Sequence, residues 1–442
     1  MTKVTIVGGG LAGAEAAWQL AEFGCFVNLY EMRPVKTTPA HVTDKLAELV
    51  CSNSLGSNLP DRASGLLKSE LKLLRSKLMV CANEAAVPAG NALAVDRGRF
   101  SELVTENITR HPNINLIHEE VVTIPDEPVI IATGPLTSPA LSEQLAALTG
   151  KKHLYFYDAL SPIVSYESID MTKAFRADRR VHSADNVGDY INCPLDQQEY
   201  ENFVTALLEA ERVPLRDFEQ DETNFFEGCL PIEVLASRGR DALAYGPMRP
   251  IGLINPHTGK RPYAVVQLRR DNFAGTLYNL VGFQTNIRWG QQREILRMIP
   301  GLEKAEFVRL GQMHRNTFVN SPTLLDPTMQ FRKHPGLFLA GQLTGIEGYV
   351  GNIASGLVAA INIARSLNNQ TLWSPPPTSM LGALCNYVAY SEAKYFQPMK
   401  ANFGILPSLP EKIKNKRERY RSYAKRALED LEASINKHSI FN

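Results

Sequence analysis

Hydrophobic and polar residues follow a regular order over the first 31 positions. The apolar run "KVTIVG" begins at Lys3, the small and apolar segment "LAGAEAAWQLAEFG" follows a group of glycines, and a second apolar run, "FVNLYE", ends at Glu31. This order predicts a strand, a helix and a second strand, and Gly24 stands where the helix is expected to end. The N-terminus is therefore predicted to form a βαβ unit.

The glycines between the first strand and the helix indicate a ligand. Gly8, Gly10 and Gly13 fill the pattern G-x-G-x-x-G, which gives a tight turn, room for a pyrophosphate against the backbone, and close packing of helix on strand. The anion then meets the N-terminus of the helix. Glu31 ends the second strand eighteen positions after Gly13, where its carboxylate can accept hydrogen bonds from ribose hydroxyls. Together these features predict a dinucleotide site.

Two later apolar runs read as buried strands of the same sheet. "PVIIATGP" (128–135) and "GLFLAGQ" (336–342) both end at glycines, and the second is followed by an apolar helix that starts near Gly351. Two-dinucleotide-fold flavoproteins have this arrangement, whereas NAD enzymes and S-adenosylmethionine methyltransferases give no reason for the late strand. Glycines and polar residues interrupt the stretch 336–364 too often for a membrane span. The predicted fold class is α/β, with a Rossmann-like FAD-binding domain.

The pattern changes between the two parts of this sheet. Residues 151–310 contain strand-like runs such as "YAVVQLR" and dense turn signals such as "NPHTGKRP", which indicate an inserted mixed α+β domain. After residue 372, "WSPPPTS" is typical of a linker into a final helical segment. The predicted division is an FAD-binding domain of residues 1–150 and 311–372, an inserted domain of 151–310 that faces substrate or RNA, and a segment of 373–442 packed on the FAD domain.

Composition narrows the class of protein. The chain has 442 residues, of which 44% are hydrophobic and 21% charged, which is typical of a globular protein with about two or three domains. Its six cysteines form no Cys-x-x-Cys pair, so reduced thiols are expected rather than disulfides or a zinc site. The first strand is too short and too rich in glycine for a signal peptide. We therefore expect a cytoplasmic protein with no bound metal and no membrane contact.

Because the net charge is close to zero, any RNA-binding surface must be a local basic patch. The formal charge is only +1, so no overall field attracts an anionic partner. The segment "EKIKNKRERYRSYAKR" (411–426) has eight Lys or Arg residues against two Glu, with tyrosines between them, and predicts a basic helix that could contact phosphates. A solvated terminal helix is the alternative interpretation.

Two cysteines occupy unusual positions. Cys229 lies between Gly228 and a Leu-Pro pair, in a stretch unlike a mid-helix or an alternating strand. Cys51 is followed by the polar turn Ser52-Asn53-Ser54, whose backbone N–H groups are expected to lower the pKa of a thiol. A thiolate can act as a nucleophile or as a base. Taken alone, either cysteine could equally be a buried packing residue.

Several long segments carry a resemblance to a known family. They are "LVCSNSLGSN", "FFEGCLPIEVLASRGRDALAYGPMRPIGL", "PYAVVQLRRDN", "YNLVGFQTNIRWGQQ", "MIPGLEKAEFVRLGQMHRNTFVNSP" and "AGQLTGIEGYV". In these segments the chain closely resembles TrmFO, the folate- and FAD-dependent tRNA uridine C5-methyltransferases. The resemblance extends from Val4 to about Leu367.

The resemblance implies a reaction. Such enzymes take a one-carbon unit from 5,10-methylenetetrahydrofolate, reduce it with FADH2 and place it as a methyl group on C5 of the T-loop uridine, position 54, of tRNA; NAD(P)H reduces the flavin again. Uracil C5 becomes nucleophilic only after a thiolate adds at C6, and a base must later remove the C5 proton. By this match Cys229 is the expected nucleophile and Cys51 the expected base, although the two roles could be exchanged.

The expected FAD contacts combine the glycine motif with the resemblance. The ribose is expected at Glu31, a phosphate or the adenine at Arg33, and a stacked flavin or pterin ring at Tyr349, which could instead be a core tyrosine. The pyrophosphate is expected at Gly8, Gly9, Gly10, Leu11, Ala12 and Gly13, and the other half of the cofactor at Gly134, Gly341 and Gln342.

Two other functions remain open at the level of sequence. One is the same chemistry on a ribosomal RNA uridine, and the other is a flavin-dependent oxidoreductase of a small molecule. A small-molecule oxidoreductase would have no use for two separated thiols or for a basic tail. A non-catalytic RNA-binding flavoprotein would need neither thiol.

Overall fold

The computed structural model describes residues 2–38, 40–126, 128–149, 154–159, 161–179, 188–213, 230–311 and 313–441. For residues 154–159 and 313–316 it describes the backbone alone.

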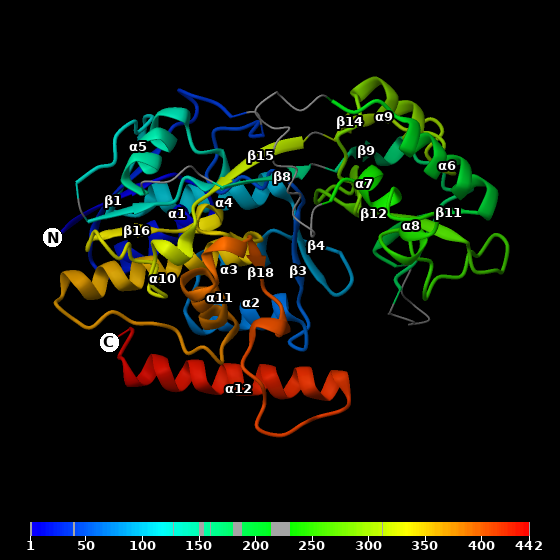
Figure 1. Ribbon diagram of the computed structural model, residues 1–442. Helices are drawn as coiled ribbons and strands as arrows, with labels where there is room; N and C mark the ends of the chain where they lie inside the picture. Colours follow the sequence, from blue (N-terminus) through cyan, green and yellow to red (C-terminus); the bar gives the residue numbers. More distant parts are fainter. Residues whose placement is uncertain are drawn as a thin grey trace.

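A five-stranded parallel sheet forms the centre of the larger part of the molecule (Figure 1). The strand order β16-β7-β1-β2-β6 places the N-terminal βαβ unit beside the two late apolar runs, so the prediction that these distant segments share one sheet is confirmed. The strands are β1 (Lys3–Val7), β2 (Phe26–Glu31), β6 (Ile114–His118), β7 (Val129–Ile131) and β16 (Leu337–Leu339).

Alternate residues of the central strands pack against different helices. Ile130 belongs to the core shared with α1 (Leu11–Glu22) and α10 (Tyr349–Leu367), whereas Val129 and Ile131 belong to a second core with α5 (Pro139–Thr149). A strand that is buried on both faces reads as a continuous apolar run. This explains why residues 128–132 have no polar position.

Helix α10 begins at Tyr349, two residues earlier than expected, and lies in the core. Among the described residues it is the one helix long and apolar enough to cross a membrane, and 83% of its most apolar stretch of 18 residues is buried inside the protein. It packs closely on α1, because a Cβ at Gly356 would lie 2.1 Å from the carbonyl oxygen of Ala12. α10 is therefore the core helix of this domain.

A second sheet lies to one side of the first (Figure 1). Its order is β10-β11-β12-β13-β9-β14, and neighbouring strands are antiparallel. An antiparallel pair, β8 (Leu154–Ala159) with β15 (Met313–Phe318), lies between the two parts. The predicted domain boundaries remain a proposal. The elements are β9 (Ile163–Ser165), β10 (Phe175–Arg176), β11 (Tyr190–Leu195), α6 (Gln197–Glu209), α7 (Ile232–Ala236), α8 (Ala242–Tyr245), β12 (Ala264–Arg270), β13 (Leu277–Leu280), α9 (Trp289–Leu296) and β14 (Phe307–Arg309).

The remaining elements surround the first sheet. A small antiparallel sheet of order β3-β5-β4 follows the loop that contains Cys51. α12 packs along α2 at the edge of the molecule (Figure 1). The elements are β3 (Ser54–Ser57), α2 (Ala63–Leu73), α3 (Lys77–Glu84), β4 (Ala86–Val87), β5 (Ala92–Val95), α4 (Arg97–Arg110), β17 (Ile346–Glu347), α11 (Met380–Tyr390), β18 (Met399–Lys400) and α12 (Lys416–Lys437).

The basic helix predicted from residue 411 begins later, at Lys416. Asn415 caps it, because the Asn415 side chain accepts hydrogen bonds from the backbone N–H groups of Arg417 and Glu418. The tyrosines of this helix are not displayed for a ligand. The ring of Tyr420 stacks on Phe403 with centroids 4.3 Å apart.

A buried carboxyl group ties the C-terminal helices to the FAD-binding part. Glu70 of α2 accepts hydrogen bonds from the backbone N–H groups of Met380 (2.7 Å) and Leu381 (2.8 Å), in the first turn of α11. Burial raises the pKa of Glu70 to about 8. The folded state therefore binds this proton more tightly than the unfolded state does.

This difference predicts a pH dependence of stability. Because the pKa of Glu70 rises from 4.5 to about 8 on folding, its contribution is fully present below about pH 4.5 and is lost as pH rises through about 8. We expect the free energy of unfolding of Glu70→Gln to fall less steeply over this range than that of the wild type. Urea titrations at several pH values measure it, with exposed Glu429→Gln as control. Parallel curves for Glu70→Gln and wild type would contradict the assignment.

Candidate active site

A cleft lies over the glycine turn, at the carboxyl ends of β1, β2 and β7. Together with the solvent at its mouth, its space measures about 1010 Å³. The structure brings together around it most of the residues predicted to contact FAD: Gly8, Gly10, Leu11, Ala12, Glu31, Arg33, Gly134, Gly341, Gln342 and Tyr349. We call this the dinucleotide cleft. Gly9 and Gly13 are not among the residues that line it.

The glycines of the turn are required by close contacts. Gly8 has φ +106°, a conformation that other residues rarely adopt. A Cβ at Gly13 would lie 1.8 Å from the carbonyl oxygen of Gly8, and one at Gly9 would lie 2.5 Å from the Leu46 side chain. A Cβ at Gly10 would meet nothing within 4 Å. No side chain caps α1 after Gly10, so a phosphate can take that place.

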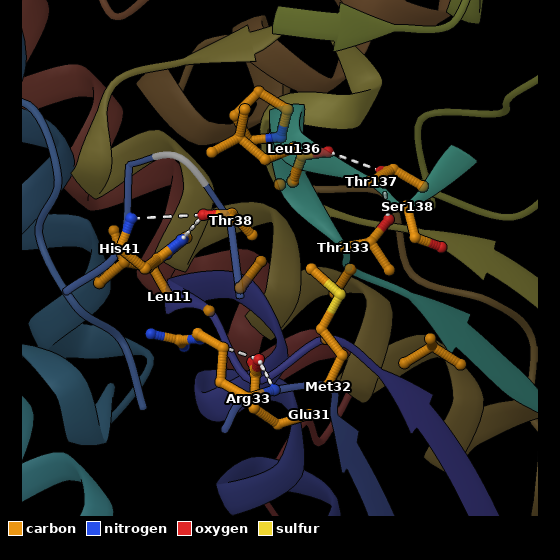
Figure 2. Close-up of a pocket in the computed structure, with 18 of the residues that line it drawn as sticks. Leu11, Glu31, Met32, Arg33, Thr38, His41, Thr133, Leu136, Thr137 and Ser138 are labelled. Atoms are coloured by element: carbon orange, nitrogen blue, oxygen red, sulfur yellow. Dashed lines mark hydrogen bonds and ion pairs between the residues drawn. The ribbon is translucent and has the colours of Figure 1, made fainter. Parts of the chain in front are cut away.

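Glu31 and Arg33 form a buried pair at the base of the cleft (Figure 2). The Glu31 carboxylate accepts hydrogen bonds from the Gly9 N–H (3.0 Å), the Arg33 N–H (3.0 Å) and Arg33 Nε (2.9 Å). Burial raises the pKa of Glu31, but the hydrogen bonds and charge of Arg33 outweigh it and hold the pKa below its usual range. A carboxylate has about four acceptor positions, so capacity for a ribose hydroxyl remains.

Arg33 is already neutralised by protein carboxylates. Besides Glu31, it donates from Nη1 to Glu48 (3.1 Å) and to the carbonyl oxygen of Thr43 (3.1 Å). The exposed fraction of Arg33 is 2%. Arg33 nevertheless lines the cleft, so its contact with a phosphate or the adenine stays a prediction.

The opposite wall consists of residues that the sequence did not single out. Figure 2 shows Thr133, Leu136, Thr137 and Ser138 on one side of the cleft and Thr38 and His41 on the other. The hydroxyl groups of Thr133 and Thr137 lie 2.7 Å apart. Residues 133–138 follow closely after β7, and the carboxyl end of a strand in an open α/β sheet is where ligands bind. That position was the one available signal.

One side chain of α10 lacks a protein partner at the cleft. Asn352 lines the cleft, is 9% exposed, and its Oδ1 has no hydrogen-bond partner among the described residues. Buried polar groups are normally satisfied, so a ligand with a donor fits this position. The glycine cradle, the uncapped start of α1 and this amide together fit a bound dinucleotide.

Cys51 lies beside this cleft and is held by backbone hydrogen bonds. The hydroxyl oxygen of Tyr349 accepts from the N–H groups of Cys51 (2.9 Å) and Ser52 (3.1 Å). On the other side, Arg309 Nη2 donates to the Cys51 carbonyl oxygen (3.1 Å) and Nη1 to that of Val50 (3.3 Å). Tyr349 is thus neither a plain core residue nor placed by these contacts as a stacking ring. It fixes the position of Cys51.

A second cleft lies on the far side of the same loop, between α4 and the inserted part. Together with the solvent at its mouth, its space measures about 1220 Å³, and it shares Glu48 and Val50 with the dinucleotide cleft. Its lining includes Arg97, Arg293, Arg309 and the half-exposed ring of Trp289. The loop that carries Cys51 therefore separates two clefts, one suited to a dinucleotide and one lined by cations.

Polar groups join the Cys51 loop to the inserted sheet. Asn53 is fully buried; its Nδ2 donates to the carbonyl oxygens of Val95 (3.0 Å) and Arg270 (2.8 Å), and its Oδ1 accepts from Arg269 (3.0 Å) and Asn279 (3.0 Å). Because each atom of this amide has partners, any tilt of the inserted sheet moves the loop as well.

Several N–H groups of the polar turn after Cys51 bind other groups, and the expectation that this turn lowers the pKa of the thiol stays a prediction. The N–H groups of Cys51 and Ser52 bind Tyr349, that of Ser54 donates to the Ser52 hydroxyl (3.3 Å), and that of Gly56 donates to the Ser54 hydroxyl (3.1 Å). They are used to shape the loop and are not available to stabilise a thiolate. Cys229, the predicted nucleophile, lies outside the described residues, so the distance between the two thiols stays untested.

Known proteins resemble this chain over most of its length. The family model described as "Glucose inhibited division protein A" matches residues 3–371. The chain is 55% identical over 434 residues to methylenetetrahydrofolate–tRNA-(uracil-5-)-methyltransferase TrmFO of Halalkalibacterium halodurans, covering 98% of this chain and 99% of the relative. It is 56% identical over 429 residues to the protein of the same name from Bacillus subtilis, covering 97% and 98%.

Among solved structures, GidA of Aquifex aeolicus has a similar fold. Its form II crystal structure matches with a TM-score of 0.69 at 15% identity, covering 100% of this chain and 74% of that chain. The form I crystal structure matches with a TM-score of 0.65 at 16% identity, covering 98% and 78%. At these identities the likeness concerns the fold alone.

Proposed function

The chain belongs to the glucose inhibited division protein A family and, within it, to the methylenetetrahydrofolate–tRNA-(uracil-5-)-methyltransferases, and from this premise we propose that its target is the T-loop uridine at position 54 of tRNA. The chain transfers a one-carbon unit from 5,10-methylenetetrahydrofolate to C5 of a uracil in tRNA, with FAD as its cofactor. The observation that carries the proposed chemistry is the position of the loop with Cys51, because Val50, directly before Cys51, lines both the dinucleotide cleft and the second, cationic cleft.

Gly8, Gly10 and the start of α1 would hold the FAD pyrophosphate, Glu31 the ribose, and Gly341 with Asn352 the flavin half. When bound and reduced, FAD supplies the hydride that converts the transferred methylene group into a methyl group. The protein supplies the rest: binding, orientation and proton transfer.

Two thiols perform the proton and bond chemistry in this proposal. The Cys229 thiolate adds to uracil C6, which makes C5 nucleophilic toward the methylene group. Cys51 then takes the proton from C5 as the bond between the methylene carbon and the folate nitrogen breaks and tetrahydrofolate leaves; once a hydride has been added to that carbon, loss of the Cys229 thiolate from C6 restores the uracil ring. Tyr349 and Arg309 orient Cys51 by holding its N–H and its carbonyl oxygen. We keep the exchange of the two roles as the alternative.

We place the folate and the uracil on the side of Cys51 that faces the second cleft. Its arginines can pair with folate carboxylates or RNA phosphates, since guanidinium groups bind such anions in a bidentate manner. The half-exposed Trp289 ring offers a surface for a planar heterocycle. NAD(P)H is the proposed reductant, and the cytoplasm the proposed location.

Nucleoside mapping tests the proposed target. Full-length protein is incubated with methylenetetrahydrofolate, NADH or NADPH, and an unmodified tRNA transcript; the RNA is then digested and its fragments are weighed by mass spectrometry. The added methyl group should lie on the T-loop fragment, and a transcript with cytidine at that position should stay unmodified. Methylation of a ribosomal RNA fragment in place of tRNA would favour the alternative.

The basic segment near the C-terminus is proposed to bind tRNA phosphates. Lys412, Lys414 and Arg421 are exposed, whereas Arg417 pairs with Asp61. Changing these three residues together to glutamine should weaken tRNA binding and lower the slope of log K against log salt by about one for each phosphate that the variant no longer binds.

Filter binding at several salt concentrations measures that slope. Exposed Lys333→Gln, on the opposite part of the FAD domain, is the control and should leave the slope unchanged. An unchanged slope in the triple variant would favour the interpretation of a solvated terminal helix.

A further inference from the structure

The position of Cys51 leaves open what makes its thiol reactive. A proton acceptor or nucleophile must be a thiolate, and an ordinary cysteine with a pKa near 8.5 is mostly protonated at neutral pH. The N–H groups of Cys51, Ser52, Ser54 and Gly56 are directed elsewhere, because they bind Tyr349 and neighbouring hydroxyl groups. The stabilisation must come from other groups around the loop.

Three arginines from three different elements converge on this loop. Arg309 of β14 binds the carbonyl oxygens of Val50 and Cys51, and Arg97 of α4 binds that of Leu49 (3.1 Å). Arg269 of β12, which is 8% exposed, reaches the same loop through Asn53. Cationic groups thus face the Cys51 segment from both the FAD-binding part and the inserted part.

Too few carboxylates lie among these three arginines to balance their positive charge. Asp271 is the one carboxylate that the described contacts place among them, and it pairs with Arg97 at 3.0 Å. The Nε atoms of Arg97 and Arg309 are buried and have no hydrogen-bond partner among the described residues. Three guanidinium groups against one carboxylate leave an excess of positive charge in a partly buried site, which favours an additional anion.

The other ionisable groups near the loop do not remove this excess. Glu48, on the same loop, is held by Arg33 and by the N–H groups of Val42 and Thr43. Burial raises the pKa of Tyr349, and a negative charge on Cys51 would raise it further, so its hydroxyl stays protonated. Arg293 lines the second cleft and adds positive charge.

The charges also act on one another. Burial lowers the pKa of Arg309 to about 10 and Arg97 lowers it further, whereas Asp271 and Cys51 raise it. Burial likewise lowers the pKa of Arg269, and Cys51 is again among the groups that raise it. A negative charge on Cys51 therefore stabilises the protonated form of both arginines, and by reciprocity the arginines stabilise the thiolate.

We propose that Arg97, Arg269 and Arg309 act as positioning residues that hold the Cys51 thiol as a thiolate in the resting enzyme. An opposite charge within about 4–6 Å commonly lowers a pKa by roughly one to three units, and a shift of about two units brings a thiol with a pKa near 8.5 below 7. This inference deepens the proposed function, on which it rests, by assigning the group that makes Cys51 ready to accept a proton.

The pH dependence of alkylation tests the proposal. FAD-loaded, full-length protein is treated with iodoacetamide at a series of pH values, and the tryptic peptide of residues 46–62, whose one cysteine is Cys51, is quantified by mass spectrometry. The midpoint should lie below pH 7 in the wild type. In Arg309→Gln it should rise by about one unit or more, a tenfold loss of thiolate below the midpoint, and Arg309→Lys should retain most of the effect.

An opposing variant separates electrostatics from damage to the loop. Asp271→Asn removes the one carboxylate among the arginines, so the midpoint should fall further, whereas a disordered loop would move it up toward 8.5. Arg293→Gln, in the same cleft but without a described contact to residues 49–51, is the matched control. The ultraviolet absorbance of the thiolate gives the same midpoint without a reagent. It is measured as the absorbance of the wild type minus that of Cys51→Ala at each pH.

Each outcome has one meaning. A wild-type midpoint near 8.5, or an unchanged midpoint in Arg309→Gln, overturns the proposed role of the arginines even if Cys51→Ala abolishes methylation. A low midpoint that depends on the arginines supports it even if methylation proceeds without Cys51, a result that would instead overturn the proposed function.

Discussion

Cys229→Ala is expected to abolish methylation and to prevent any covalent complex with RNA. Uracil C5 cannot attack an electrophile until a nucleophile has added at C6, so loss of that thiolate removes the first chemical step. Removal of a catalytic nucleophile commonly costs on the order of 10⁴-fold or more in rate. The measurement is methyl incorporation into tRNA, together with denaturing electrophoresis after incubation with T-arm RNA that contains 5-fluorouracil.

Cys51→Ala should give a different result in the same two assays. A base that removes the C5 proton is not needed for addition at C6, so this variant should lose methyl transfer but keep the covalent complex. Cys193→Ala is the control, because the Cys193 thiol is fully buried in the inserted domain and burial raises its pKa far above the working range. The opposite pattern, a complex lost in Cys51→Ala and kept in Cys229→Ala, would exchange the two roles.

Gly13→Ala should unfold the cofactor site, whereas Gly10→Ala should affect only the cofactor. The new Cβ at position 13 would lie 1.8 Å from the Gly8 carbonyl oxygen, so β1 and α1 must separate. Overpacking typically costs about 1–3 kcal/mol, and the close contact with a backbone atom places this variant at the upper end. At position 10 the new Cβ meets no protein atom within 4 Å, but it occupies the space through which a pyrophosphate approaches the backbone.

Two measurements distinguish these variants. The melting temperature of the apoprotein should fall in Gly13→Ala and stay unchanged in Gly10→Ala. The bound flavin absorbance should be lost in Gly13→Ala and the affinity for FAD reduced in Gly10→Ala. Normal melting and normal FAD binding in Gly13→Ala would contradict the account of the turn.

The fold was largely predictable because its signals are local or continuous. The βαβ unit follows from glycines a few residues apart, and β7 and β16 follow from apolar runs that are buried on both faces. The start of α12 at Lys416 was missed because the basic pattern extends beyond the capping residue, Asn415. Charge pattern alone does not mark where a helix begins.

Only the part of the dinucleotide cleft that the glycine motif itself forms was predictable from the sequence. The contacts that fix Cys51 join it to Tyr349 and Arg309, which are 298 and 258 positions away, and nothing near Cys51 in the sequence indicates them. Likewise, Glu31 and Arg33 were both expected to serve the ligand, and nothing in the sequence indicates that the two also pair with each other. Long-range packing decides such contacts, and it becomes visible only in the folded chain.

The central claim is that the methyl carbon reaches uracil from folate at a site bordered by Cys51 and FAD. The most direct measurement follows that carbon. The FAD-loaded enzyme, reduced with NADPH, is given methylenetetrahydrofolate with a carbon-13 methylene group. The tRNA is then digested, and the mass of its 5-methyluridine is measured by mass spectrometry. The account predicts that the heavy carbon appears in the methyl group of the wild type and in none of the Cys51→Ala product. Unlabelled 5-methyluridine, or methylation that requires S-adenosylmethionine, would contradict it.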